Sequence, residues 1–335
     1  MPAVATPVVS VFMDVEDPIN LTADDAVLDI ASLFTEVGVV GSFCVTGDKC
    51  RVLRQRGRTD VVEALKPHCL GLHTNGHSRH PTTMEMLAEA SFADGRILAY
   101  REEVQGFEAF VDLFERPPVF WGGAGNTWSP EITDALNRLG IEAYSYALTS
   151  IPSGGVHRFN GSMALPQTLW ASEDEWSVPE AAERAMERVL EGVATTELPW
   201  IGIFVGHPTR FRHARFWDEP FAAGRTPTVP ELTPSVPKEV YRTALASLRR
   251  FLVRLIGRTT VVGVDHVLSM PWRLRRANPR ELDHFRTATA ANLRAAKAWP
   301  IHRPDLSVER IVAKTLAKAE TLEIAEILPE AVPGD

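Results

Sequence analysis

Short apolar runs rich in β-branched residues alternate along the chain with longer segments in which apolar residues recur every three or four positions. The short runs predict strands and the longer segments predict helices, an alternation typical of β/α units around a parallel sheet. The predicted strands are residues 7–13, 41–47, 69–73, 118–123, 141–147, 201–207 and 259–265. The predicted helices are residues 23–36, 49–65, 83–114, 129–139, 177–194 and 237–256. So many units in one chain favour a barrel, complete or incomplete, over an open sheet.

Two long segments interrupt or follow this alternation. Residues 208–236 are rich in proline and aromatic residues and predict an ordered loop, which together with residues 151–176 is expected to narrow the barrel mouth. Residues 276–335 are predicted to be mostly helical. Within them, residues 306–328 carry apolar side chains at helical spacing, consistent with packing on the barrel or on another copy of the chain. We therefore predict a barrel domain over residues 1–275 and a helical C-terminal extension over residues 276–335.

Composition narrows the classes of partner. The chain has 335 residues, 45% of them hydrophobic and 23% charged, and a formal net charge of -8, so a broad basic surface for nucleic acid or anionic membrane is not expected. Cys44, Cys50 and Cys69 show no paired spacing that would indicate a disulfide framework or a zinc ribbon. The first apolar run has no basic region before it and meets Asp14 too early for a signal peptide, so we expect a cytoplasmic protein.

Polar residues follow several of the predicted strands. The first strand runs into "DVED", the third into "HTNGH", the fourth into "GGAGN" and the late "IGIFVG" strand into His207. In a parallel barrel the strands end together at the edge where active sites form. His73 and His77 with one carboxylate would leave coordination positions open, as in a catalytic zinc site. A lone histidine pair, or a carboxylate such as Asp17 that caps a helix, is common without function, so the prediction depends on the coincidence across strands.

These residues give the chain a resemblance to the polysaccharide deacetylases that carry a NodB homology domain, carbohydrate esterase family four, over roughly residues 7–270. "SVFMDVEDP" resembles the first motif in its acid-x-acid variant, and "GSFCVTGDKCRVL" resembles the second strand and its helix. "HTNGH" matches the His-Ser/Thr-x-x-His metal motif, and "IFVGHP" resembles the late strand that delivers a catalytic histidine. The resemblance implies a distorted (β/α)7-8 barrel of the deacetylase type, with the extension added at its C-terminus.

The resemblance also implies roles for individual residues. A divalent metal ion, zinc by preference, is expected on His73, His77 and Glu16, with Asp17 as the alternative carboxylate. Asp14 is then expected to be the general base for water attacking an amide carbonyl, and His207 the acid that protonates the departing nitrogen. His80 is expected near the site through a hydrogen bond or a loop position, with direct metal contact as the less favoured alternative.

One departure from the family pattern affects the substrate. The family's third motif normally offers an arginine, whereas this chain has Trp121 and Gly122 there, and Arg116 stands at the start of that strand. Such a loss is found among members that hydrolyse cyclic imides or ureides. The first hypothesis is N-deacetylation of a small acetylated amino sugar or its conjugate. The alternatives are an allantoinase-like hydrolase of cyclic imides or ureides and a non-catalytic carbohydrate-binding relative, although Asp14 and His207 together favour an enzyme.

Aromatic and amide side chains on or beside predicted loops are candidates for the pocket, although such residues more often serve the core or a subunit contact. They are Trp121, Asn126, Trp128, Trp170, Trp176, Phe211, Phe216 and Trp217. The expected narrowing of the mouth predicts a small substrate rather than a long polymer.

Overall fold

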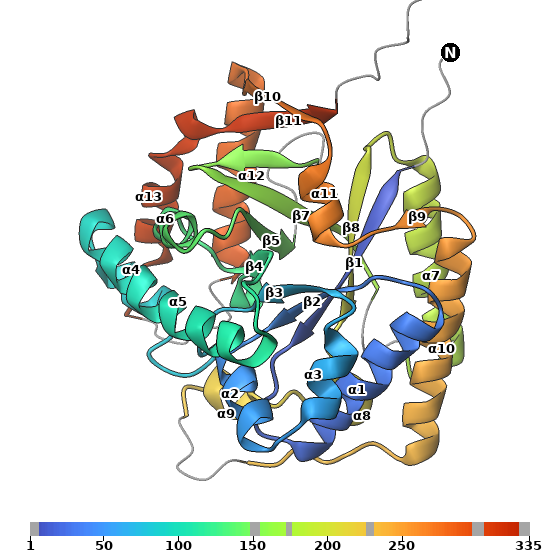
Figure 1. The fold of residues 1–335 in the computed structure, drawn as a ribbon. Coiled ribbons are helices and arrows are strands. Elements are labelled where there is room, and N and C mark those ends of the chain that lie inside the picture. Colours follow the sequence, from blue (N-terminus) through green and yellow to red (C-terminus); the bar gives the residue numbers. More distant parts are fainter. Residues whose placement is uncertain (1–6, 148–154, 172–175, 226–230, 297–304, 328–335) are drawn as a thin grey trace, which may run out of the picture.

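The computed structural model describes residues 7–147, 155–171, 176–225, 231–296 and 305–327. Within these ranges seven parallel strands close into a barrel (Figure 1). In order around the ring they are β1 (Val8–Val15), β2 (Ser42–Val45), β3 (Cys69–Leu72), β4 (Phe120–Gly122), β5 (Ala143–Ala147), β7 (Ser162–Trp170) and β8 (Trp200–Gly206). Strand β8 pairs with both β7 and β1, which closes the ring. The predicted barrel is therefore confirmed, in a seven-stranded form.

Two strand predictions are corrected by this arrangement. The segment 259–265, predicted as a barrel strand, contributes only β9 (Thr260–Val261), which pairs with the first residues of β1, and then α11 (Val264–Ser269). The strand that completes the barrel is β7, inside the segment expected only to narrow the mouth. Pro166 lies in the middle of β7 opposite Tyr146, and a proline within an apolar run argues against a central strand because it has no N–H to donate.

Helices cover the outside of the barrel (Figure 1). They are α1 (Leu21–Glu36), α2 (Gly47–Gln55), α3 (Thr59–Leu65), α4 (Thr83–Glu89), α5 (Phe92–Phe114), α6 (Pro130–Leu139), α7 (Pro179–Thr195) and α10 (Lys238–Ile256). The segments 49–65 and 83–114, each predicted as one helix, are both divided in two. Thr82 begins α4 with a capping box to Glu85 and Ser91 caps α5, so both helices of the second segment begin at a side-chain acceptor, whereas α3 begins without one.

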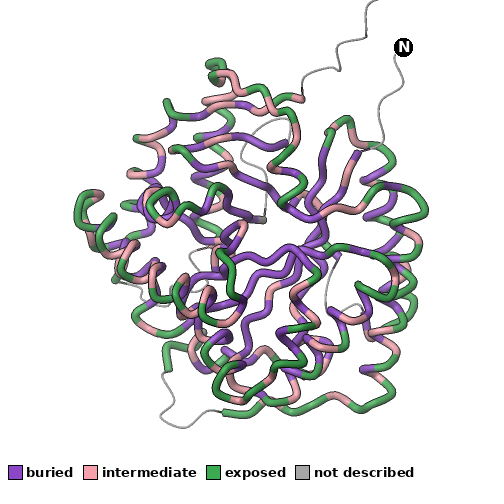
Figure 2. Tube along the Cα trace, in the orientation of Figure 1, coloured by how far each residue is buried: buried purple, intermediate pink, exposed green. Residues whose placement is uncertain are grey.

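The barrel interior and the layer beneath the helices form two cores. Phe12, Phe120 and Trp200 meet edge to face inside the barrel, whereas Val11 and Met13 belong to the cluster outside it. Because side chains alternate along a strand, the face of β1 that directs Phe12 inward also directs Asp14 inward, nearer the carboxyl end. Figure 2 shows buried residues concentrated along the strands and exposed residues on the outer helices.

The C-terminal part adds strands as well as helices. Helices α12 (Pro279–Ala296) and α13 (Val308–Leu316) lie between β10 (Trp272–Arg276) and β11 (Glu323–Ile327), and β6 (His157–Phe159) joins this antiparallel addition to β7. The helical prediction for residues 306–328 is therefore wrong after the short 3-10 helix Ala319–Thr321, where the chain becomes β11. Pairing with β6 and β10 overrides the helical spacing there. The division at residue 276 stays a prediction.

The long segment after β8 is folded rather than open. It contains α8 (Pro208–Arg212) and α9 (Glu219–Ala222), and a 3-10 turn, Ala124–Asn126, follows β4 at the same end of the barrel. Nowhere in the described ranges does a helix combine the length and the apolar character needed to cross a bilayer.

Candidate metal centre

Five polar residues predicted from the sequence lie together at the carboxyl end of the barrel. Asp14 and Glu16 come from the end of β1, His73 and His77 follow β3, and His207 follows β8. Ligand atoms of Glu16, His73 and His77 lie within 4.8 Å of one another, as do those of Asp14, Glu16 and His207. Strands far apart in the sequence therefore bring one set of nitrogen and oxygen donors to a single place.

Glu16 is the centre of this group. Its Oε2 lies 2.9 Å from His77 Nε2 and 3.1 Å from His73 Nε2, while Trp217 Nε1 donates to Oε1 at 3.0 Å. Burial alone raises the pKa of Glu16, but the facing rings of His77 and His207 outweigh it and hold that pKa well below its usual range. Glu16 is thus an anionic carboxylate with one oxygen held and the other directed at two imidazoles.

Each of the two imidazole rings, His73 and His77, makes a hydrogen bond through Nδ1. This bond determines which ring nitrogen carries no hydrogen in the neutral form. His73 Nδ1 lies 3.1 Å from the carbonyl oxygen of Gly122, which can only accept, so Nδ1 carries the proton. When it is neutral, the ring presents the Nε2 lone pair to Glu16. Gly122 permits this approach, because a Cβ there would lie 2.7 Å from Cys44 Sγ and 3.2 Å from His73 Nδ1. A side chain at this position would therefore disturb the placement of His73.

A three-residue relay does the same for His77. Its Nδ1 lies 2.6 Å from Ser78 Oγ, and Ser78 in turn donates to Asp218 Oδ2. His77 Nδ1 is then the donor to Ser78, and its Nε2 lone pair also faces Glu16. Burial raises the pKa of Asp218 to about 7, although His77 opposes the rise. Sequence reasoning missed Ser78 and Asp218, since only the fold brings residue 218 beside the histidine loop.

These tautomers supply the fit test for a metal. With both rings neutral, two lone pairs and a carboxylate oxygen converge, and this arrangement is repulsive unless a proton or a metal cation lies between them. Burial lowers the pKa of His73, but Asp14, Cys44 and Glu16 outweigh it and raise that pKa well above its ordinary value, which reflects the same demand. Two imidazoles and one carboxylate are ligands that zinc accepts, and the set fits a divalent cation.

Exposure separates the three converging residues from the other two. The side chains of Glu16, His73 and His77 are 1%, 3% and 4% exposed, whereas those of Asp14 and His207 are each 16% exposed. His207 Nε2 lies 3.9 Å from Asp14 Oδ2. Burial raises the pKa of Asp14, and the His73 and His207 rings partly offset the rise. Asp14 and His207 are thus the more exposed members of the group.

The loop that carries the histidines is braced from α5. Thr74 and His77 have φ of 53° and 45°, left-handed values that are uncommon for residues with a side chain. Thr74 Oγ1 donates to Glu103 at 2.6 Å, and Trp121 Nε1 donates to the same carboxyl at 2.9 Å. Burial raises the pKa of Glu103 to about 7, against the two hydrogen bonds. Trp121 therefore stabilises the histidine loop indirectly, through the Glu103 carboxyl group that it shares with Thr74.

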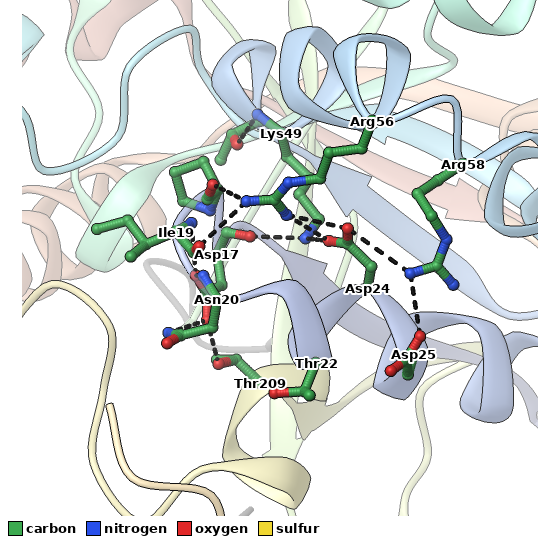
Figure 3. A network of polar contacts seen from close by, with 12 residues as sticks. Asp17, Ile19, Asn20, Thr22, Asp24, Asp25, Lys49, Arg56, Arg58 and Thr209 are labelled. Atoms are coloured by element: carbon green, nitrogen blue, oxygen red, sulfur yellow. Dashed lines mark hydrogen bonds and ion pairs between the residues drawn. The ribbon is translucent and has the colours of Figure 1, made fainter. Parts of the chain in front are cut away.

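Two other sequence candidates do not join the group. The Asp17 carboxylate accepts from the backbone N–H of Ile19 and Asn20 and from Thr209 Oγ1 at 2.6 Å (Figure 3). His80 bonds through Nδ1 to Glu85 at 2.8 Å and through Nε2 to the Phe221 carbonyl at 2.8 Å. Burial lowers the pKa of His80, but these two partners outweigh it and raise that pKa. The geometry favours Glu16 over Asp17 and gives His80 a loop-holding position.

The group opens into a pocket of about 300 Å³. Trp170, Phe204 and Phe216 form an aromatic wall, with Phe204 and Phe216 ring centroids 5.2 and 4.8 Å from His207. Asn126, Ser145, Tyr146 and Gln167 add neutral polar groups to the lining. Of the aromatic candidates from the sequence, Trp170 and Phe216 line the pocket, whereas Trp128, Trp176 and Phe211 lie in the core.

Arg116 lies at the opposite end of β4, where Nη2 donates to the carbonyls of Lys66 and His68 at 3.0 and 2.9 Å. It therefore does not stand in for the missing arginine, as expected. Lysine and arginine are absent from the described lining of the pocket.

Comparison with known proteins supports the architecture. The sequence matches no family model, and no curated protein matches it. A presumed polysaccharide deacetylase from Mycobacterium smegmatis shares the fold with a TM-score of 0.50 and 17% identity, covering 80% of this chain and 90% of that one. The chain therefore has the deacetylase fold predicted from its motifs.

Two further solved structures are more distant. A peptidoglycan N-acetylglucosamine deacetylase is 14% identical with a TM-score of 0.44, covering 77% of this chain and 86% of that chain. A carbohydrate esterase family four pseudoenzyme from Bacillus anthracis is 9% identical with a TM-score of 0.45, covering 79% and 66%. Similarity at this level adds nothing about activity, so function has to be argued from the site.

Proposed function

We propose that the protein is a metal-dependent hydrolase of carbon–nitrogen bonds in amides, other than peptide bonds. The observation that carries this proposal is the convergence of two Nε2 lone pairs on Glu16, flanked by the pocket-facing Asp14 and His207. A pure binding site for sugars needs no such cation site, and it needs no acid and base on opposite strand ends. Glu16, His73 and His77 would hold the ion, zinc by preference.

The chain's own residues then have distinct roles. When bound, a divalent ion supplies Lewis acidity toward water and toward a carbonyl oxygen. Asp14 accepts the proton of the attacking water, since burial favours its protonated form and it faces the pocket. His207 gives a proton to the nitrogen as the carbon–nitrogen bond breaks. Phe204 and Phe216 pack beside His207 and limit the water around it.

The pocket also limits the substrate. A volume of about 300 Å³ suits a small molecule better than a long polymer. The segments 148–154, 172–175 and 226–230 contain no lysine or arginine in the sequence, and neither does the described lining. Arg215, close by, has its Nη1 3.4 Å from Glu219 Oε2 and is paired with it. Apart from the proposed ion, a substrate anion would therefore find no lysine or arginine in the described lining, so the expected substrate is uncharged.

The first candidate is a small acetylated amino sugar, deacetylated to the free amine and acetate. The second candidate is a cyclic imide or ureide, which the sequence favours because Trp121 and Gly122 stand where the family's third motif would offer an arginine. Aromatic walls accept both kinds of ring.

A substrate panel tests the proposal. Zinc-loaded protein is incubated with N-acetylglucosamine, with cyclic imides and ureides, and with insoluble chitin, and acetate release or ring opening is measured. Turnover of a small amide with little release from the polymer supports it. Metal content is measured beside it, with His80→Ala as the matched control for His73→Ala and His77→Ala. A protein that binds the ion but turns over no amide would instead support a non-catalytic role.

A further inference from the structure

A buried lysine lies behind the metal centre, away from the pocket. The Lys49 side chain on α2 is 1% exposed, and its Nζ donates to Asp24 Oδ1 at 2.5 Å and to the carbonyl oxygen of Asp17 at 2.6 Å. Asp24 on α1 is completely buried. The proposed reaction uses neither side chain, so their burial needs another reason.

Arg56 extends the pair into a network, drawn in Figure 3. Its Nη1 donates to both Asp24 oxygens at 2.9 and 3.1 Å, while its Nη2 donates to the carbonyls of Pro18 and Ile19 at 2.9 and 3.0 Å. Three successive carbonyls, those of residues 17, 18 and 19, thus each accept from a cation that Asp24 holds in place.

The clamped residues directly follow Glu16 in the chain. From the other side, the Asp17 carboxylate accepts from the N–H groups of Ile19 and Asn20 and from the hydroxyl of Thr209, two residues after His207. Side chains therefore bind both the backbone N–H groups and the backbone carbonyls of this loop. These bonds hold the backbone that follows Glu16 in one conformation. Loops of this kind otherwise show the higher mobility of surface connections.

Stability alone does not explain such a network. A buried ion pair costs much of its attraction in desolvation, and apolar residues of similar volume often serve folding as well or better. What apolar residues cannot do is hold carbonyl groups. We propose that Lys49, Asp24 and Arg56 are positioning residues that fix the β1–α1 loop so that Glu16 directs Oε2 at His73 and His77; this inference rests on the proposed function.

The test compares metal affinity with stability in folded variants. Arg56→Met removes two of the three carbonyl clamps with a side chain that is only 19% exposed. Lys49→Met combined with Asp24→Leu removes the buried pair and leaves Arg56 without its carboxylate partner. We expect each to raise the zinc dissociation constant about 10- to 100-fold, the usual effect of outer-shell changes. The matched control is Arg54→Met on α2, the helix that carries Lys49. It breaks an exposed ion pair with Asp112 of α5 and should leave zinc affinity unchanged.

Zinc affinity is measured by competition with a chromophoric chelator, and unfolding by urea. Wild-type affinity in both folded variants overturns the positioning role, whatever their stability. If the double variant does not fold, Arg56→Met alone decides in the same way. A wild-type protein that binds no zinc would overturn the metal centre itself and this inference with it, so the two failures are distinguished.

Discussion

Trp217 donates a hydrogen bond of 3.0 Å from its indole Nε1 to Oε1 of Glu16, across 201 positions of the sequence. The bond leaves only Oε2 of that carboxylate to face the two histidines. The Trp217 ring also packs on His77, with centroids 5.6 Å apart. One residue of the loop after β8 therefore orients two of the three proposed ligands.

Trp217→Phe should weaken zinc binding roughly 10-fold, because it removes the donor that orients Glu16 while keeping most of the ring. Trp176→Phe is the matched control. That indole is also buried and donates to the Val205 carbonyl at 3.0 Å, away from Glu16. Competition titration with a chelator measures the zinc affinity of both variants. Equal loss of affinity in the two variants would show that the Trp217 bond has no particular role.

The carboxylates are expected to separate by function. Asp14→Asn should keep the ion and lose at least about 100-fold in kcat, the usual contribution of a general base. Glu16→Gln should weaken metal binding. Asp17→Asn should cost stability, about 1 to 3 kcal/mol for its buried hydrogen bonds, with metal content retained. Metal analysis, steady-state kinetics and urea unfolding give the three readouts. Metal loss in Asp17→Asn but not in Glu16→Gln would reassign the ligand.

Charge on the substrate should matter as well as its size. N-acetylglucosamine and its 6-phosphate share the reacting amide, and the described pocket lining includes the acidic residues Asp218 and Glu219 but no lysine or arginine to pair with the phosphate. We expect kcat/KM for the phosphate to be lower by at least about 10-fold, equivalent to ~1.4 kcal/mol. If neither sugar reacts, the same comparison is made with a cyclic ureide and a carboxylated analogue. A preference for the anion would contradict the neutral-substrate proposal.

His157 predicts a loss of stability on acidification. Burial lowers its pKa to about 4, against a hydrogen bond with the Gly155 carbonyl. The unfolded chain binds this proton near pH 6.5 and the folded protein only near pH 4, so this histidine's contribution to stability falls as pH drops through that window. At ~1.4 kcal/mol per pKa unit the loss reaches about 3 kcal/mol. The free energy of unfolding in urea, measured at pH 7, 6 and 5, should fall more steeply with decreasing pH for wild type than for His157→Asn. An equal fall in the two proteins would refute the prediction.

Much of the fold, and the five polar residues of the site, could be predicted from sequence patterns. Asp14, His73 and His207 are each followed or preceded by apolar strand runs, so their common edge follows from parallel pairing alone. Because Pro166 lies in β7, the sequence pattern did not predict that barrel strand. The end of the segment predicted as a helix forms β11 instead, which pairs with β6. Local propensity could not predict either outcome, because both are decided by neighbours distant in sequence.

The supporting residues were beyond sequence reasoning for a similar reason. Asp218, Trp217 and Lys49 have ordinary surroundings in the chain, and each acquires its role only through a contact with a distant segment. The His80 interpretation was open in the sequence because three histidines stand close together, and only its partners Glu85 and Phe221 distinguish it from the other two.

The central claim is that one divalent ion binds between Glu16, His73 and His77. Anomalous diffraction from zinc-loaded crystals, collected above and below the zinc absorption edge, tests it most directly. The account predicts a single strong peak about 2.0 to 2.2 Å from His73 Nε2, His77 Nε2 and Glu16 Oε2, with Asp14 and His207 beside it. No peak there, or a peak held by Asp17 or His80 instead, would contradict it.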